Sequence, residues 1–121
     1  MKIEREQSPG RNAFTGYGKD YVEVNGERHS ASVVVSGESV APWSARSPRE
    51  LTRADVAPVV ALKPEIVLIG TGASLVFPDP AALADIHAAR IGVEVMDTQA
   101  ACRTYNILLG EGRNVVAALI L

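Results

Sequence analysis

Three polar side chains near the C-terminal end of the sequence have the spacing needed to act together. Arg103 lies four residues after Gln99 and three before Asn106, so on a helix the three are neighbours and form a polar row. An arginine in such a row can offer a fork of N–H donors to a carboxylate or a phosphate. The row is either the wall of a recognition or active site, or a solvated face on which Arg103 pairs with Asp97 or Glu111.

The single cysteine, Cys102, is the obvious candidate for a nucleophile. It lies beyond the first turn of the predicted helix and on its apolar side, so we expect a buried, inert thiol. The two histidines lie on separate elements, and the spacing gives no Ser–His–Asp arrangement. We therefore assign no catalytic residue and favour a non-enzyme. An enzyme would draw on charged residues that can equally form a structural ion-pair network: Asp97, Arg103, Glu111 and Arg113.

A glycine-rich segment, Gly-Thr-Gly-Ala-Ser at 70–74, suggests a phosphate loop at first sight. It has no Gly-Lys-Ser/Thr ending and no third glycine at dinucleotide spacing. The following residues 75–78 are extended in pattern, so nucleotide binding is disfavoured and the glycines are expected to allow a sharp turn. No cofactor is predicted. His29 has no second histidine or cysteine at ligand spacing, so no metal site is predicted either.

The polar row needs a helix to position it. Asp97 or Thr98 can cap that helix, and Gly110 or Gly112 can end it. An apolar stripe of helical spacing is predicted to face the core: Thr98, Ala101, Cys102, Tyr105, Leu108 and Leu109. The apolar run 115–121 then predicts a strand that is covered on both faces.

The pair Asn25-Gly26 favours a two-residue turn, which predicts a β-hairpin in the first half of the chain. Its register pairs Val24 with Glu27 and Val22 with His29. One face carries the residues expected in the core: Val22, Val24, Ala31, Val33 and Val35. Residues 36–50 are expected to form a loop in which Trp43 plugs the border of the core or, less favoured, belongs to a binding surface.

Strands alternate with helices in the second half, which predicts parallel pairing with helices packed on the sheet. The strands are 65–70 and 93–96. One helix spans 52–62, with Pro58 in its first turn if Asp55 caps it, and otherwise with a kink. Another starts at Asp79-Pro80 and stops at Gly92. If the two strands are neighbours, four side chains share one cleft at their carboxyl ends: Thr71, Asp97, Thr98 and Arg103.

Composition indicates one globular domain. The 121 residues are 47% hydrophobic and 21% charged, with a formal net charge of −2. That charge offers no footprint for nucleic acid, and no apolar run reaches the ~18–20 residues that span a bilayer. The N-terminus lacks the apolar stretch of a signal peptide, so we expect a cytoplasmic protein. Residues 1–18 are expected to be a polar leader ending in an edge strand near 13–17, and 19–121 the single domain, as a monomer or weak homodimer.

The segment 96–108 (Met-Asp-Thr-x-Ala-Ala-Cys-Arg-Thr-Tyr-Asn-x-Leu), followed by Glu-Gly-Arg at 111–113, resembles the signature of domain-of-unknown-function family 498, the Mth 938-like domain family. The Gly-Thr-Gly loop at 70–72 and Pro42-Trp43 also resemble segments of that family. The resemblance implies an α/β fold of three layers (β+α/β/α), with a central mixed sheet, an N-terminal hairpin layer on one side and helices on the other. It also implies kinship with a mitochondrial assembly factor for respiratory complex I.

The resulting hypothesis is a small non-catalytic module that recognises protein partners, with respiratory-complex subunits as partners by analogy. The alternative is a small-molecule-binding protein or an enzyme that uses the same cleft. The predicted recognition surface comprises Gly70, Thr71, Gly72, Asp97, Thr98, Gln99, Arg103, Asn106, Glu111 and Arg113.

Overall fold

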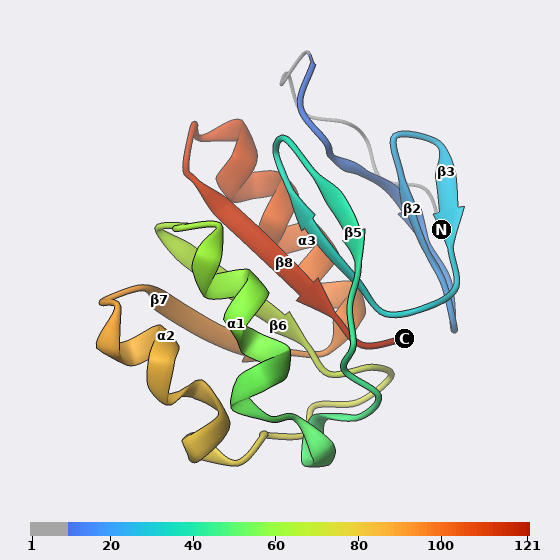
Figure 1. Ribbon diagram of the computed structural model, residues 1–121. Coiled ribbons are helices and arrows are strands. Elements are labelled where there is room, and N and C mark those ends of the chain that lie inside the picture. The colour runs from blue at the N-terminus through green and yellow to red at the C-terminus, as the bar shows by residue number, and fades with distance from the viewer. Residues whose placement is uncertain (1–9) are drawn as a thin grey trace.

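The computed structural model describes residues 10–121 (Figure 1). The strands are β1 (Phe14–Tyr17), β2 (Val22–Val24), β3 (Glu27–His29), β4 (Val33–Ser36), β5 (Val40–Pro42), β6 (Ile66–Gly70), β7 (Gly92–Met96) and β8 (Val115–Leu119). The α-helices are α1 (Arg53–Ala61), α2 (Ala84–Ala88) and α3 (Thr98–Gly110), and short 3-10 helices occur at η1 (Pro48–Glu50) and η2 (Pro80–Leu83). Within this part of the chain, no helix has the length and apolar character needed to cross a membrane.

The central sheet has five strands in the order β5-β4-β8-β6-β7. β6 lies parallel to β7 and β8, whereas β4 runs antiparallel to β8 and β5, so the sheet is mixed as predicted. β8 occupies the middle, and all its residues are buried, as its apolar sequence predicted. Its side chains alternate between two cores. Val115, Ala117 and Leu119 belong to one core, and Val116, Ala118 and Ile120 to the other.

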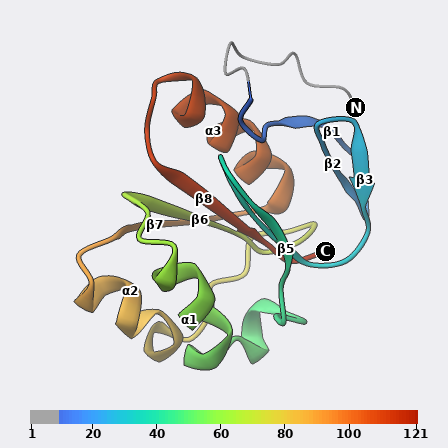
Figure 2. The ribbon, with the colours of Figure 1, turned by 45° about the horizontal axis from the view of Figure 1, so that its top comes forward.

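Figure 2 shows the central sheet between two outer layers. α1 and α2 cover one face, and α3 covers the other together with a small three-stranded sheet of β1, β2 and β3. Each face has its own hydrophobic core. The predicted fold class, a three-layer α/β domain of the β+α/β/α type, is confirmed. The α-helix of the β+α layer is α3, which lies beside the hairpin.

The predicted hairpin has the expected register, with Val22 opposite His29 and Val24 opposite Glu27. Asn25 and Gly26 both have positive φ, at 50° and 84°, as the predicted two-residue turn requires. The prediction that Ala31 continues the core face is wrong, because Ala31 is exposed. β3 ends at His29, and the chain then crosses to the other sheet, so the alternation of faces does not carry through this segment.

Strand β1 forms where an edge strand was expected, and it pairs with β2. Phe14 is fully buried, and its ring packs edge-on against Tyr105 of α3 with 5.1 Å between the ring centroids. Residues 14–17 therefore pack with the domain, although the sequence-based boundary was placed after residue 18. Residues 1–9 of the expected leader lie outside the described residues.

Helix α1 begins one residue after Thr52, which forms a capping box with Asp55. Of the two predicted arrangements, the one with Asp55 as the cap and Pro58 in the first turn does not occur, because Thr52 is the N-cap. Pro58 lies in the middle of α1 and leaves the carbonyl of Ala54 without its helical donor. Both residues face solvent, where water can satisfy that carbonyl, so the helix continues to Ala61.

The segment 36–50 is more ordered than the predicted loop, because it contains β5 and η1. β5 pairs with β4, which places Val34 opposite Ala41. Trp43 is buried in the core beneath α1, and its indole N–H donates to the Asp55 carbonyl at 2.8 Å. The prediction that Trp43 plugs the border of the core is therefore confirmed.

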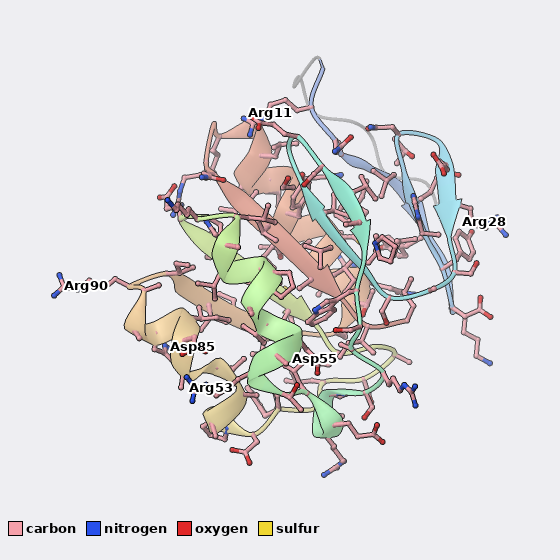
Figure 3. All side chains as sticks on the ribbon, in the orientation of Figure 1. Arg11, Arg28, Arg53, Asp55, Asp85 and Arg90 are labelled. Atoms are coloured by element: carbon pink, nitrogen blue, oxygen red, sulfur yellow. The ribbon has the colours of Figure 1, made fainter. Side chains whose placement is uncertain are left out.

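The predicted helix after Asp79 is split into η2 and α2. Asp79 caps the start by accepting a hydrogen bond from the Ala81 N–H at 2.9 Å. The predicted stop at Gly92 is wrong, because Arg90 adopts the left-handed conformation with φ 59° and Gly92 already belongs to β7. Arg90 points away from the molecule in Figure 3.

Candidate functional site

The segment after β6 and the start of α3 meet at the carboxyl ends of two parallel strands. β6 and β7 are neighbours, as predicted. Their junction is held by Thr98, whose hydroxyl accepts from the Gly72 N–H at 2.8 Å and donates to the Ile120 carbonyl at 2.9 Å. A side chain on Gly70 would lie 2.7 Å from Leu119 and 2.9 Å from the Thr98 hydroxyl. The close approach of three chain segments therefore requires glycine at position 70.

Thr71 has a structural role in the loop that follows β6. It is buried, and its hydroxyl donates to the Ser74 carbonyl at 2.7 Å and accepts from the Val76 N–H at 3.2 Å. Its backbone N–H donates to the Met96 carbonyl at 2.9 Å. These bonds close the loop on itself and tie it to the end of β7, so the Thr71 side chain is not presented to a ligand.

Asp97 is the N-cap of α3, one of the two residues predicted for that role. Its carboxylate accepts a hydrogen bond from the Ala100 N–H at 2.9 Å. The helix ends at Gly110, and Gly112, two residues later, supplies the left-handed residue with φ 78°. The N–H of Gly112 donates to the Leu109 carbonyl and that of Arg113 to the Leu108 carbonyl, both at 3.0 Å, which is the Schellman pattern.

A hollow of about 550 Å³ opens at this end of the sheet, and we call it the C-terminal cleft. Its walls include five of the predicted residues: Gly72, Asp97, Thr98, Gln99 and Arg103. Sequence reasoning missed the remaining walls: Gly18, Lys19, Asp20, Ala73, Ile120 and Leu121. The β1–β2 turn supplies three of these, and only the packing of the small sheet against α3 reveals its place.

Arg103 projects from α3 into the C-terminal cleft, where its side chain is exposed. Its Nη1 donates to the Tyr17 hydroxyl at 2.7 Å, and its guanidinium lies 5.7 Å from the centre of that ring. The ion pair with Asp97 or Glu111, which belonged to the solvated-face alternative, is not present among residues 10–121. The fork of Arg103 thus keeps donors that face the cleft. Gln99 beside it donates to the Gly18 carbonyl at 3.3 Å.

Asn106 fits neither interpretation of the polar row, because the residue is buried, with only 3% of its surface exposed. Its amide oxygen accepts from the Phe14 N–H at 2.9 Å, and its amide nitrogen donates to the Phe14 carbonyl at 2.7 Å. The side chain therefore pairs with the outer border of β1 as a neighbouring strand would. The prediction that Asn106 belongs to the recognition surface is wrong.

Glu111 and Arg113 lie at the far end of α3 and do not reach the C-terminal cleft. Glu111 is exposed at the C-cap. Arg113 pairs with Glu65 at 2.9 Å, with both side chains partly exposed. The predicted surface therefore splits into residues of the cleft and residues of a separate surface ion pair, which is worth little to stability.

Cys102 packs in the core between α3 and the central sheet and is fully buried. Burial raises the pKa of its thiol to about 12, an effect that the nearby Arg103 charge only partly offsets. A thiol in this state carries almost no thiolate at neutral pH. No cluster of three His, Cys, Asp or Glu side chains that could hold a metal ion occurs within residues 10–121.

Two large apolar side chains lie exposed on the loop between β6 and η2. Leu75 is 51% exposed and Phe77 is 70% exposed. The sequence signal was an apolar run, 75–78, that matched neither a helix nor a predicted strand, but its exposure depends on the tertiary fold. Near its start, this loop contains Gly72 and Ala73, which line the C-terminal cleft. We refer to Leu75 and Phe77 as the apolar loop.

Comparison with known proteins gives a match to the family described as "Protein of unknown function (DUF498/DUF598)" over residues 14–120. A relative from Bos taurus, named NADH dehydrogenase (ubiquinone) 1 alpha subcomplex assembly factor 3, is 34% identical over 122 residues. The match covers 99% of this chain and 66% of the bovine protein.

Solved structures of bacterial proteins share the fold along nearly their whole length. A crystal structure from Bordetella parapertussis superposes with a TM-score of 0.88 at 41% identity, covering 93% of this chain and 98% of that one. A solution structure from Bordetella pertussis, described as a Mth938-like domain, has a TM-score of 0.82 at 34% identity, covering 99% and 92%.

Removal of the Asn106 amide tests its structural role. We expect Asn106→Ala to lower the free energy of unfolding by about 3 kcal/mol, because the buried N–H and carbonyl of Phe14 lose their partner. Urea denaturation measures the change. Asn114→Ala is the matched control, since Asn114 is exposed and its side chain makes one 3.3 Å bond, to the Lys63 carbonyl; the substitution should change stability by less than about 0.5 kcal/mol. Equal effects of the two substitutions would contradict the assigned role.

The buried state of Cys102 predicts slow chemical modification. We expect a thiol reagent at pH 8 to label the unfolded protein in urea at least on the order of 100-fold faster than the native protein, because the native thiol must first be exposed by opening. The labelling rate can be followed by absorbance or mass spectrometry. Rapid native labelling would show an accessible thiolate and restore the nucleophile hypothesis.

Proposed function

The chain belongs to the DUF498/DUF598 family, and from this premise we propose that it is a non-catalytic module that binds a protein partner during assembly of a larger complex. The bovine relative is named as an assembly factor of NADH dehydrogenase. We infer by analogy that the partner class is a subunit of that kind of respiratory complex. The apolar loop beside the C-terminal cleft is the observation that carries this proposal.

Phe77 is 70% exposed, and Leu75 near it in the chain is 51% exposed; exposed apolar side chains that gather within a polar border mark interaction sites. Phe77 and Leu75 lie on a loop whose base is fixed by the Thr71 hydroxyl and by the Thr98 bonds to Gly72. Large apolar side chains held on a fixed backbone are the usual centre of a protein interface. The apolar loop therefore fits the anchor of a partner-binding surface.

The C-terminal cleft, which is lined by the first residues of the same loop, carries charged groups of both signs. Lys19 and Arg103 supply cations to the C-terminal cleft, and Asp20 and Asp97 supply carboxylates. A mixed polar rim around an apolar centre is the common composition of interfaces between proteins that also exist apart. The predicted surface, reduced to its cleft residues and joined to the apolar loop, supports a protein partner.

The groups that line the C-terminal cleft favour recognition over catalysis. Among the described residues, its walls contain no histidine and no cysteine. The thiol of Cys102 is buried with a raised pKa, so it is poorly placed as a nucleophile. Asp97 is engaged as a helix cap, and the Thr98 hydroxyl both donates and accepts within the fold. Arg103 and Gln99 remain as groups suited to binding.

A second candidate function is the binding of a small anionic molecule in the same cleft. Its volume of about 550 Å³ lies in the range of ligand sites, and Arg103 can offer donors to a carboxylate or phosphate. A thermal-shift screen against metabolites distinguishes this candidate from the first. A carboxylate or phosphate compound that stabilises the wild type but not Arg103→Ala would favour it over a protein partner.

Substitution of the apolar loop tests the proposed partner surface. We expect Phe77→Ser to reduce recovery of respiratory-complex subunits in a quantitative pull-down from the source cells by at least about tenfold, since an anchor side chain contributes more than about 1.4 kcal/mol. Arg103→Ala should give a smaller loss of the same proteins. Folding of each variant is checked by circular dichroism and thermal unfolding.

Leu62→Ser provides the matched control for this experiment. Leu62 is 42% exposed, close to the exposure of Leu75, but it follows α1 and lies near Asn114 at the opposite end of the sheet. It should recover the same subunits as the wild type. The proposed surface would be overturned if Phe77→Ser recovered as much of these subunits as the wild type. It would also be overturned if neither the wild type nor any variant recovered a subunit. The cytoplasmic location and the monomeric or weakly dimeric state stay predictions, which cell fractionation and light scattering would test.

A further inference from the structure

The two sheets have four outer strands, β1, β3, β5 and β7, and these differ in what covers their free backbone groups. On β1, the N–H and carbonyl of Phe14 are paired with the Asn106 amide. β3 is three residues long and charged, and Arg28 lies against the Tyr21 ring (Figure 3). β5 contains Pro42, which has no N–H to donate. These three strands carry devices that block the addition of another strand.

The outer side of β7 is protected less, because this five-residue strand has no proline and carries a single charge, Glu94. The Gly92 N–H donates to the Glu65 carbonyl and the Met96 carbonyl accepts from Thr71, so alternate residues of β7 point toward β6. By this alternation, the N–H and carbonyl groups of Val93 and Val95 point outward. Within residues 10–121, no hydrogen bond reaches these four groups.

Apolar side chains on both faces of β7 are also incompletely covered. Val93 and Val95 are half-buried against the core beneath α1 and α2. Met96 is half-buried on the other face, against the core beneath α3. Ile66 on that face is left open as well, because its neighbour across the β6–β7 pair is Gly92. A strand added to β7 would bury apolar area on both faces while it pairs the free backbone groups.

We propose that the outer side of β7 is a second interaction surface, which binds an extended strand of a partner protein that carries a basic residue opposite Glu94. The free donors and acceptors of Val93 and Val95 specify an extended backbone, since only a strand presents complementary groups in a row. This surface is separate from the apolar loop and does not depend on the function proposed above.

The exposed side chain of Glu94 determines the charge of the occupant. It lies between the two residues with free backbone groups, so the added strand places one side chain directly across from it. A lysine or arginine there is favoured by opposite charge. Pairing of two copies of β7 in the register that uses all four free groups sets Val93 against Val95 and Glu94 against Glu94. Like charges at that position destabilise a self-pair, so a partner protein is favoured over a second copy.

Amide hydrogen exchange of the full chain tests this surface with two defined peptides. One alternates valine and lysine, and the other alternates valine and glutamate. At ten times its dissociation constant, we expect the lysine peptide to slow exchange of the Val93 and Val95 amides about tenfold. The glutamate peptide should have a weaker effect at equal concentration. Glu94→Lys should reverse the preference, whereas Glu38→Lys, a charge reversal at an exposed turn near β5, should not.

A backbone block supplies the second arm of the experiment. Val95→Pro removes an N–H that makes no internal bond, so the fold should persist in the NMR spectrum while the slowing of exchange at Val93 is lost. If Val95→Pro does not fold, Glu94→Lys still tests the proposal. Three results would each overturn the proposal: no slowing with either peptide, no reversal by Glu94→Lys, or protection of Val93 and Val95 that rises with protein concentration alone and so identifies a second copy.

Discussion

The pairing of the Asn106 amide with the backbone of Phe14 is the interaction on which the two-sheet architecture depends. A sheet of few short strands is stable when it has an apolar face to bury or a helix to pack against, and β1 and β2 bury their apolar side chains in the same core as α3. The contact lies at a buried site, where the Phe14 N–H and carbonyl would otherwise be unpaired at full desolvation cost. Arg103 and Gln99 add bonds from the same helix face to Tyr17 and Gly18. The polar row therefore joins the small sheet to α3, and only its first two members also reach the cleft.

Features of the fold that arise from local chemistry could be predicted from the sequence. The hairpin register at Asn25-Gly26, the Asp97 cap and the apolar strand β8 depend on neighbours in the chain, and all three are confirmed. Predictions failed where a distant segment decides the outcome. Asn106 looked solvated because its partner, Phe14, lies 92 residues away. The helix was predicted to stop at Gly92, but Arg90 takes the left-handed conformation after α2, and Gly92 begins β7.

The candidate site shows the same division between local and distant causes. The rule that ligand clefts open at the carboxyl ends of parallel strands placed Thr71, Asp97, Thr98 and Arg103 together, because it needs only the order of strands and helices. Asp97, Thr98 and Arg103 do line the cleft, whereas the Thr71 hydroxyl is bonded within its own loop. The rule could not supply the β1–β2 turn with Lys19 and Asp20, which belongs to the other sheet. The exposure of Phe77 also could not be predicted from the sequence, because an apolar run is expected in the core until the packing of the whole domain is known.

The Thr98 hydroxyl joins the loop after β6, the first turn of α3 and the end of β8 through one buried oxygen atom. Those three segments therefore cannot shift independently, and the backbone that carries Leu75 and Phe77 is anchored at its origin before any encounter. A mobile loop loses conformational entropy when a partner binds it, and this loss weakens binding; a loop that is already fixed avoids the loss. Because the loop is ordered during folding, a small apolar contact made by Leu75 or Phe77 contributes to binding affinity without this entropy loss.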